Sequence, residues 1–155
     1  VLGGGGQEGG LRSGTENVAG AIGFAAALKE TKIINVERVQ LLRDKLLDGL
    51  ESLGGRLVGS RDERLWNIAT VVFADRDGED VVMRLSEKGV MCGTGSACSS
   101  RKEDDRVLGA LGLSEKEAGG VVRVSLGAEH TGEDIDFVLK EVREVLSDLK
   151  DSVRY

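Results

Sequence analysis

The segment Gly93 to Ser100 contains the side chain with the most evident chemistry, the thiol of Cys98. Glycine and serine surround this cysteine, so the loop packs poorly and we expect the thiol to reach a substrate. Arg101 and Lys102 follow closely and favour the thiolate, which is the nucleophilic form. The pattern predicts a nucleophilic cysteine, with a buried and idle thiol as the alternative.

The second cysteine, Cys92, ends the apolar run Val90-Met91-Cys92, where a small hydrophobic side chain fits, and we interpret it as structural. Five residues separate it from Cys98, a spacing that matches no zinc motif. With His130 as the only histidine, too few ligands remain for a closed metal site, so we expect no metal. A hydrolase built on Cys98 and His130 is a weaker alternative.

Arg123 alternates with Val122 and Val124 in a run typical of a strand, so it points away from the face that the valines occupy. An arginine in this position reaches solvent, or it binds a carboxylate through two parallel N–H groups. The sequence therefore makes Arg123 a candidate for binding a carboxylate.

A second binding candidate is the segment Arg12-Ser13-Gly14-Thr15, which precedes an expected helix. Free backbone N–H groups and the helix dipole favour an anion such as phosphate at a helix start. The alternative is plain helix capping, by a capping box of Ser13 and Glu16 or by Thr15 itself.

The elements that position these residues follow from hydrophobic periodicity. Apolar residues at three- and four-residue intervals predict helices over 16–31 and 36–53, from Asp77 to Lys88, and from the cap Thr131 onward. A short helix ends near Gly112, and Ser114 with Glu117 forms a capping box. Runs rich in Val and Ile predict strands over 56–58, 67–73, 90–92 and 121–126. This order favours an α+β fold, a small mixed or antiparallel sheet covered by helices on one face.

Composition narrows the class of protein. The 155 residues are 40% apolar with a net charge of −6, which argues against a general nucleic-acid surface. Neither a membrane span nor an export signal is visible, so we expect a cytoplasmic protein. Proline is absent while glycine occurs 23 times, a composition that keeps open an engineered or excised domain.

Three motifs then occur in order along the chain, and together they resemble the NifS/IscS class of cysteine desulfurases. The similarity runs almost end to end and matches the last portion of the family's sequences. The motifs are Gly4-Gly5-Gly6-Gln7-Glu8 with Arg12-Ser13-Gly14-Thr15-Glu16-Asn17, then Gly95-Ser96-Ala97-Cys98-Ser99-Ser100, then Val122-Arg123-Val124-Ser125-Leu126-Gly127.

The resemblance implies a fold-type-I, class V aminotransferase-like enzyme that uses pyridoxal phosphate. Residues 1–15 would be a remnant of the large domain and residues 16–155 the small C-terminal domain. By resemblance, Cys98 accepts sulfur from L-cysteine as a persulfide, Arg123 binds the substrate carboxylate, and Thr15 contacts the cofactor phosphate of the partner subunit in a homodimer. Iron–sulfur scaffold or sulfur-carrier proteins are the implied recipients of the sulfur.

The lysine that holds the cofactor belongs to a part of the family's sequence that has no match here. We therefore expect this chain alone to bind no pyridoxal phosphate and to be inactive as a desulfurase. Two alternatives stay open: a non-catalytic scaffold domain, engineered or excised, and a thiol-based carrier or hydrolase that uses Cys98.

Overall fold

The computed structural model describes residues 3–31, 35–94 and 106–152 of the chain. These residues fall into two compact units, Val1–Ile34 and Asn35–Tyr155. The boundary expected between residues 15 and 16 lies inside the first unit. The assignment of residues 1–15 to a large domain and of the remainder to a small domain stays a prediction.

The first unit contains a short 3-10 helix, η1 (Glu8–Gly10), and the helix α1 (Val18–Thr31). Asn17 caps α1, because its side-chain oxygen accepts the N–H of Gly20 at 2.9 Å. The predicted caps at Ser13 and Thr15 are wrong: α1 begins later than expected, and only Asn17 directly precedes its first turn. The apolar stripe predicted for α1 is not covered, since none of its side chains is buried.

The second unit is built on a four-stranded antiparallel sheet in the order β1-β2-β4-β3. Its strands are β1 (Arg56–Leu57), β2 (Ile68–Val72), β3 (Gly93–Thr94) and β4 (Val121–Ser125). The prediction of a strand at 90–92 is wrong, because β4 pairs with Gly93 and Thr94 instead. Val90 is buried, whereas Met91 is 76% exposed, so this apolar run is an irregular segment that buries one of its side chains.

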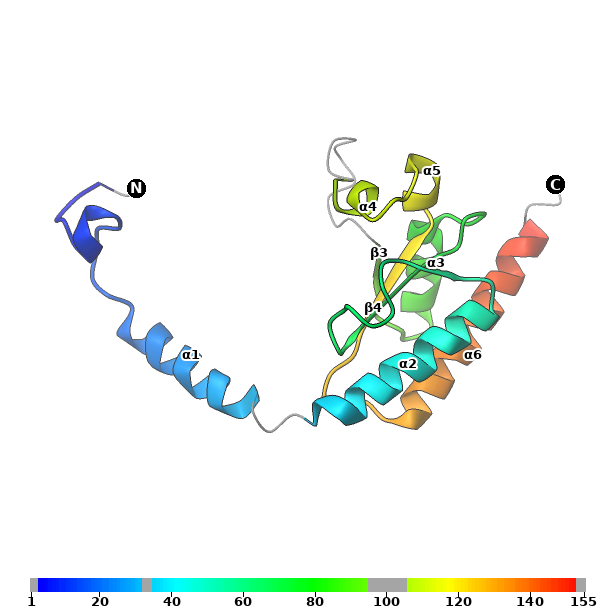
Figure 1. Cartoon of the computed structure of the whole chain (residues 1–155), viewed down its shortest axis with the longest axis horizontal. Coiled ribbons are helices and arrows are strands. Elements are labelled where there is room, and N and C mark those ends of the chain that lie inside the picture. Colours follow the sequence, from blue (N-terminus) through cyan, green and yellow to red (C-terminus); the bar gives the residue numbers. More distant parts are fainter. Residues whose placement is uncertain (1–2, 32–34, 95–105, 153–155) are drawn as a thin grey trace. The chain divides into compact units, whose positions relative to one another are not determined.

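Three long helices lie on one side of the sheet: α2 (Val36–Ser52), α3 (Gly78–Glu87) and α6 (Gly132–Ser152). Helices α2 and α3 pack against this face of the sheet, the inner face, and α6 packs against both of these helices (Figure 1). The apolar spacing that predicted these helices also supplies their buried side chains, which meet the inward residues of β2 and β4. The core includes Val39, Leu46, Leu47, Leu50, Ala69, Val71, Val81, Leu85, Val122, Val124, Ile135, Val142 and Val145.

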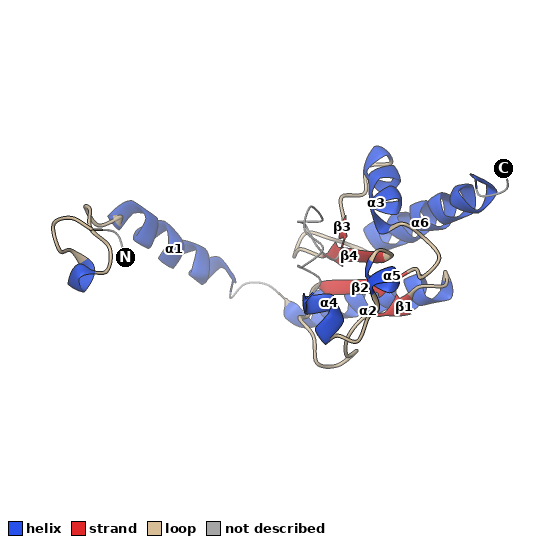
Figure 2. Ribbon diagram, turned by 90° about the horizontal axis from the view of Figure 1, so that it is seen from above, coloured by secondary structure: helices blue, strands red, loops and turns tan. Residues whose placement is uncertain are grey.

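On the opposite face of the sheet, the outer face, the described residues form a helical cover at one end. The short helices α4 (Arg106–Ala110) and α5 (Glu115–Ala118) follow one another there (Figure 2). Leu108 and Leu113 form a buried cluster with Val58, Val72 and Val121. The predicted α+β class is confirmed, with this second, partial layer of helix added to it.

Side chains at the helix starts match the sequence pattern in the second unit. Asp77 accepts the N–H groups of Glu79 and Asp80, and Ser114 with Glu117 forms the predicted capping box. The hydroxyl of Thr131 accepts the N–H of Asp134 at the start of α6. No helix in the described ranges has the length and apolarity needed to cross a membrane.

Candidate functional site: the open half of the sheet around Arg123

Arg123 lies in the middle of β4 on the outer face, as the alternation with its neighbours predicted. Val122 and Val124 are buried, while Arg123 is exposed. The cluster under α4 and α5 ends at the pair Val72–Val121, so no helix in the described part of the chain covers the half of the outer face that holds Arg123. Arg123 therefore presents its guanidinium to solvent from a rigid central strand.

The two strands beside β4 place different residues next to Arg123. Leu126 donates to the carbonyl of Asn67 at 2.8 Å and Phe73 donates to that of Gly120 at 2.9 Å. In an antiparallel strand pair, opposite residues alternate between hydrogen-bonded and non-hydrogen-bonded pairs. Counting from these two bonds, Thr70 and Arg123 form a non-hydrogen-bonded pair, in which the two side chains lie closer together. On the other side, Arg123 pairs with Gly93 of β3, which has no side chain.

A hollow of about 250 Å³ borders the same open half of the sheet. Its walls come from β2, from the loop between β1 and β2, and from the end of α4. They are Val58, Gly59, Ser60, Glu63, Arg64, Leu65, Ile68, Thr70 and Leu111. Thr70 thus lines the hollow and also faces Arg123 across the strand pair.

Arg64 is part of the wall of this hollow, as is the acidic residue Glu63. Arg64 donates to the backbone carbonyls of Ser60 at 2.6 Å and Val58 at 2.8 Å, which holds the loop against β2. Burial, and then the charge of Arg43, lower the pKa of Arg64 from its ordinary value. In the described part of the chain neither Arg64 nor Arg123 forms an ion pair with a carboxylate. The guanidinium of Arg64 is occupied by backbone carbonyls, so the exposed guanidinium of Arg123 is the group on this part of the sheet that is available to an anion.

Thr15 lies in the first unit, in a loop that Arg12 holds together. The Arg12 guanidinium donates to the carbonyls of Gly14 at 2.9 Å and Thr15 at 3.1 Å, and Gln7 accepts the N–H of Gly14 at 3.2 Å. The side chain of Thr15 is exposed. Among the described residues its hydroxyl has no hydrogen-bond partner, so it is available to a ligand.

The main candidate nucleophile, Cys98, lies outside the described residues. Cys92 is described and is half-buried, and burial raises the pKa of its thiol to about 11. This environment agrees with the interpretation of Cys92 as structural. It also means that a thiolate at neutral pH is not expected at Cys92.

His130 belongs to the turn between β4 and α6. Its Nδ1 accepts the N–H of Gly127 at 2.8 Å, so the neutral ring carries its proton on Nε2. Pairing of His130 with Cys98 stays a prediction, because Cys98 is not described. Within residues 3–31, 35–94 and 106–152 there is no group of three His, Cys, Asp or Glu side chains that would hold a metal ion.

Two neighbours of Arg123 were not among the residues predicted from the sequence: Thr70 and Gly93. Both are set beside Arg123 by strand register, which joins segments about 50 and 30 residues away in the sequence. Thr70 gave no signal of its own in the sequence. The sequence places Gly93 at the start of the cysteine loop, whereas in the structure it is a residue of strand β3.

Residues 5–138 match the family model described as Aminotransferase class-V. The chain belongs to this family, whose members depend on pyridoxal phosphate. The match covers most of both units, including Thr15 and Arg123.

Within that family the chain is similar to cysteine desulfurases of the NifS/IscS kind. It is 39% identical to cysteine desulfurase IscS 1 of Archaeoglobus fulgidus, over 97% of this chain and 41% of that protein. It is 40% identical to cysteine desulfurase IscS of Methanosarcina thermophila, over 97% of this chain and 38% of that protein. The solved structure of a NifS-like protein superposes with a TM-score of 0.78 at 35% identity, over 95% of this chain and 38% of that one. The chain thus spans about 40% of the length of these relatives.

Proposed function

We propose that this chain supplies the substrate-binding and sulfur-accepting part of a cysteine desulfurase that acts on L-cysteine. The observation that carries the proposal is Arg123, an exposed guanidinium on a central strand that forms no ion pair in the described part of the chain. The family, and the similarity to cysteine desulfurases, supply the substrate class.

Arg123 is the proposed contact for the carboxylate of L-cysteine. Two parallel N–H groups of a guanidinium match the two oxygens of a carboxylate, which fixes orientation as well as position. β4 is held on both edges, by β2 and by β3, so the base of the side chain is fixed. Arg64 lies in the wall of the hollow that Thr70 also lines, where its guanidinium binds backbone carbonyls.

Thr15 is the proposed contact for the phosphate group of the cofactor. Thr15 offers an exposed hydroxyl, and the backbone of its loop is held by Arg12. When bound, pyridoxal phosphate supplies the electron sink that carbon–sulfur cleavage requires. Because the lysine that anchors the cofactor has no match in this chain, we expect the chain alone to bind no cofactor and to release no alanine from cysteine.

Cys98 is the proposed sulfur acceptor. Its thiolate attacks the sulfur atom of the bound cysteine, so that a sulfur–sulfur bond forms as the carbon–sulfur bond breaks. The electron pair of the broken bond stays with the carbon fragment, which takes up protons and leaves as alanine. Cys98 is left as a persulfide, whose outer sulfur passes to an iron–sulfur scaffold or sulfur-carrier protein. A homodimer would allow Thr15 to serve the cofactor of the partner subunit.

The test uses the chain by itself, with glutathione persulfide as the sulfur donor. We expect mass spectrometry to find one additional sulfur atom on Cys98 at neutral pH. The Cys98→Ala variant should lose this modification, whereas the matched variant Cys92→Ala should keep it, because the raised pKa of Cys92 leaves that thiol protonated.

Equal sulfur loading of both cysteines would contradict a special role for Cys98. No loading at all would favour the scaffold interpretation over the sulfur-accepting one. Incubation with pyridoxal phosphate and L-cysteine adds a second check: a cofactor absorbance band with alanine release would show that our account of the missing lysine is wrong.

A further inference from the structure

We infer that Gly93 is a positioning residue for Arg123: the side chain that Gly93 lacks leaves the space over β3 in which the guanidinium lies. This inference rests on the proposed role of Arg123 as a carboxylate contact. It concerns the orientation of the Arg123 guanidinium, which the family assignment and the sequence motif do not describe.

The first observation is the distance between the two residues. A Cβ atom added at Gly93 would lie 3.8 Å from Nη2 of Arg123, and within residues 3–31, 35–94 and 106–152 no other atom outside the neighbouring residues comes as near. Gly93 is the direct partner of Arg123 in the β3–β4 register. The guanidinium therefore lies over β3 rather than straight out from the sheet.

The second observation explains the direction of this lean. Thr70 occupies the other side of Arg123, in the pair whose side chains approach most closely. Thr70 is β-branched and partly buried, and it is fixed in the wall of the hollow. Among the described residues, Arg123 thus has a rigid neighbour on the β2 side and a partner without a side chain on the β3 side.

The third observation is that the backbone does not require glycine at position 93. Gly89, four residues earlier, has a φ of +84°, which other residues rarely adopt. Gly93 is an extended strand residue outside the group of positive-φ glycines. A side chain at position 93 is therefore opposed by the guanidinium of Arg123 and not by backbone strain.

The size of the free space sets the limit on substitution. At 3.8 Å, a single methyl group from alanine is in ordinary van der Waals contact with Nη2. The two further carbons of valine would enter the volume of the guanidinium and turn it away from β3. A turned guanidinium would no longer direct both N–H groups at the same carboxylate.

The experiment compares the full chain with Gly93→Ala and Gly93→Val by NMR of the arginine Nε–H groups. Sodium propionate is the carboxylate probe, with sodium chloride at equal ionic strength as the control. We expect propionate to shift the Arg123 signal in the parent and in Gly93→Ala. In Gly93→Val the concentration for half of that shift should rise at least about threefold, because one of the two bidentate bonds is lost. The signal of Arg56, paired with Glu117, should not respond.

The outcomes separate the inference from the proposed function. Equal propionate responses in all three proteins would overturn the role of Gly93 and leave Arg123 as a carboxylate contact. If propionate shifts none of them, the proposed contact fails, and the role of Gly93 is decided by the nuclear Overhauser effect between the Arg123 side chain and the Gly93 α-protons. Absence of this effect in the parent overturns the inference. This measurement needs only the parent protein, so it also decides the matter if Gly93→Val does not fold.

Discussion

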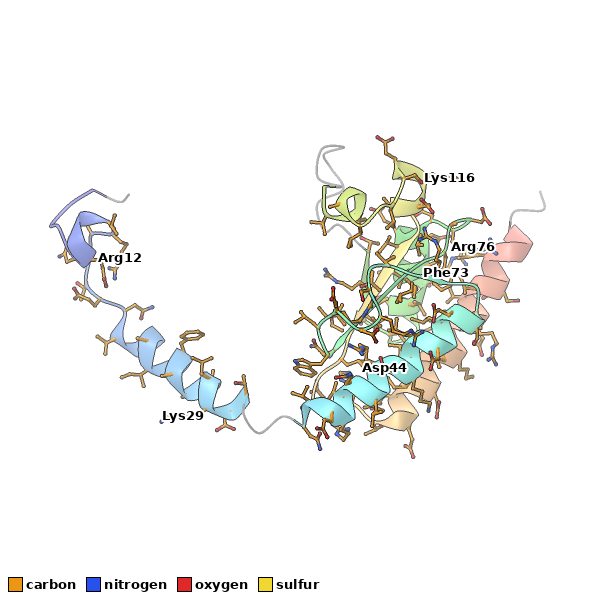
Figure 3. All side chains as sticks on the ribbon, in the orientation of Figure 1. Arg12, Lys29, Asp44, Phe73, Arg76 and Lys116 are labelled. Atoms are coloured by element: carbon orange, nitrogen blue, oxygen red, sulfur yellow. The ribbon has the colours of Figure 1, made fainter. Side chains whose placement is uncertain are left out.

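The guanidinium of Arg43, on α2, donates a hydrogen bond of 3.0 Å to the carbonyl oxygen of Leu65, in the loop before β2. The side chain of Arg43 is 3% exposed, and its Nε and Nη2 atoms donate to Asp44 Oδ1 at 2.9 and 2.6 Å. Figure 3 labels Asp44 on α2. The buried guanidinium of Arg43 thus connects α2 to the loop before β2, which lines the same hollow as Thr70.

Replacing Arg43 by methionine should destabilise the second unit by about 1–3 kcal/mol, because the carbonyl of Leu65 loses a buried partner. Urea unfolding followed by circular dichroism measures the change. Lys45→Met is the matched control on the same helix: its ion pair with Asp136 is exposed, so the loss should stay below about 1 kcal/mol. Equal losses in the two variants would contradict the anchoring role of Arg43.

Gly119 and Gly120 precede β4, and the structure predicts opposite tolerance at the two positions. A Cβ at Gly120 would lie 2.3 Å from the carbonyl oxygen of Phe73 and 3.0 Å from that of Arg76, both backbone atoms. Phe73 and Arg76 are labelled in Figure 3. A Cβ at Gly119 would meet only the carbonyl of Lys116, at 3.5 Å.

We therefore expect Gly120→Ala to destabilise the fold by about 1–3 kcal/mol, since the backbone around Phe73 must shift. Gly119→Ala should be neutral or slightly stabilising, because the backbone of Gly119 is already helical. Thermal and urea unfolding of the two variants, side by side, measure the difference. A smaller loss for Gly120→Ala than for Gly119→Ala would show that the packing of this turn is described wrongly.

The helices and central strands of the second unit could be predicted because their signals are local. Val39, Leu46 and Leu50 repeat at helical spacing and are buried, and Val122 and Val124 alternate with Arg123 and face the core. The predicted caps at Ser114 and Thr131 hold for the same reason, since each needs only residues within one turn.

What the sequence did not reveal depends on residues that are distant along the chain. The strand expected at 90–92 lies at Gly93–Thr94 because β4 determines where pairing occurs, and an apolar run does not show its partner. Thr70 and Gly93 become neighbours of Arg123 through that same register. The cap of α1 was misplaced for a different reason: Ser13, Thr15 and Asn17 are all good capping residues, and the first helical residue decides among them.

The reactivity of Cys92 is the third prediction. Burial raises the pKa of its thiol to about 11 in the folded chain. Iodoacetamide should therefore modify Cys92 slowly at neutral pH, with a rate that rises about tenfold for each pH unit until the thiol ionises. Peptide mass spectrometry of the folded and urea-unfolded chain measures both rates. Equal rates at neutral pH would mean that Cys92 is not protected by burial.

The pH dependence of stability is the fourth prediction. Lys88 of the α3 C-terminus lies 3.1 Å from Glu141 and 2.8 Å from Glu144 on α6. Hydrogen bonds from Lys88 hold the pKa of both carboxyl groups below their ordinary value. Their contribution to stability is present above the pKa of the unfolded chain, about 4.3, and is lost as the pH falls from there through the folded values.

Urea unfolding at a series of pH values from about 7 to about 3 should show this loss. Lys88→Met removes the shared partner, so its stability should depend less steeply on pH over the acidic range. Part of the dependence should remain, because Thr131 and Ser114 also lower the pKa values of Asp134 and Glu117. Identical pH profiles for parent and variant would contradict the role assigned to Lys88.

The order of the strands in the sheet has a consequence for synthesis of the chain. β3 leaves the ribosome before β4, yet its only neighbour in the described sheet is β4. β2 also has one edge without a partner at this stage, because the edge opposite β1 pairs with β4. Until residues 121–125 have emerged, both edges stay unpaired, so the sheet of the second unit closes only after β4 is synthesised, and before that the nascent chain exposes strand edges to other chains.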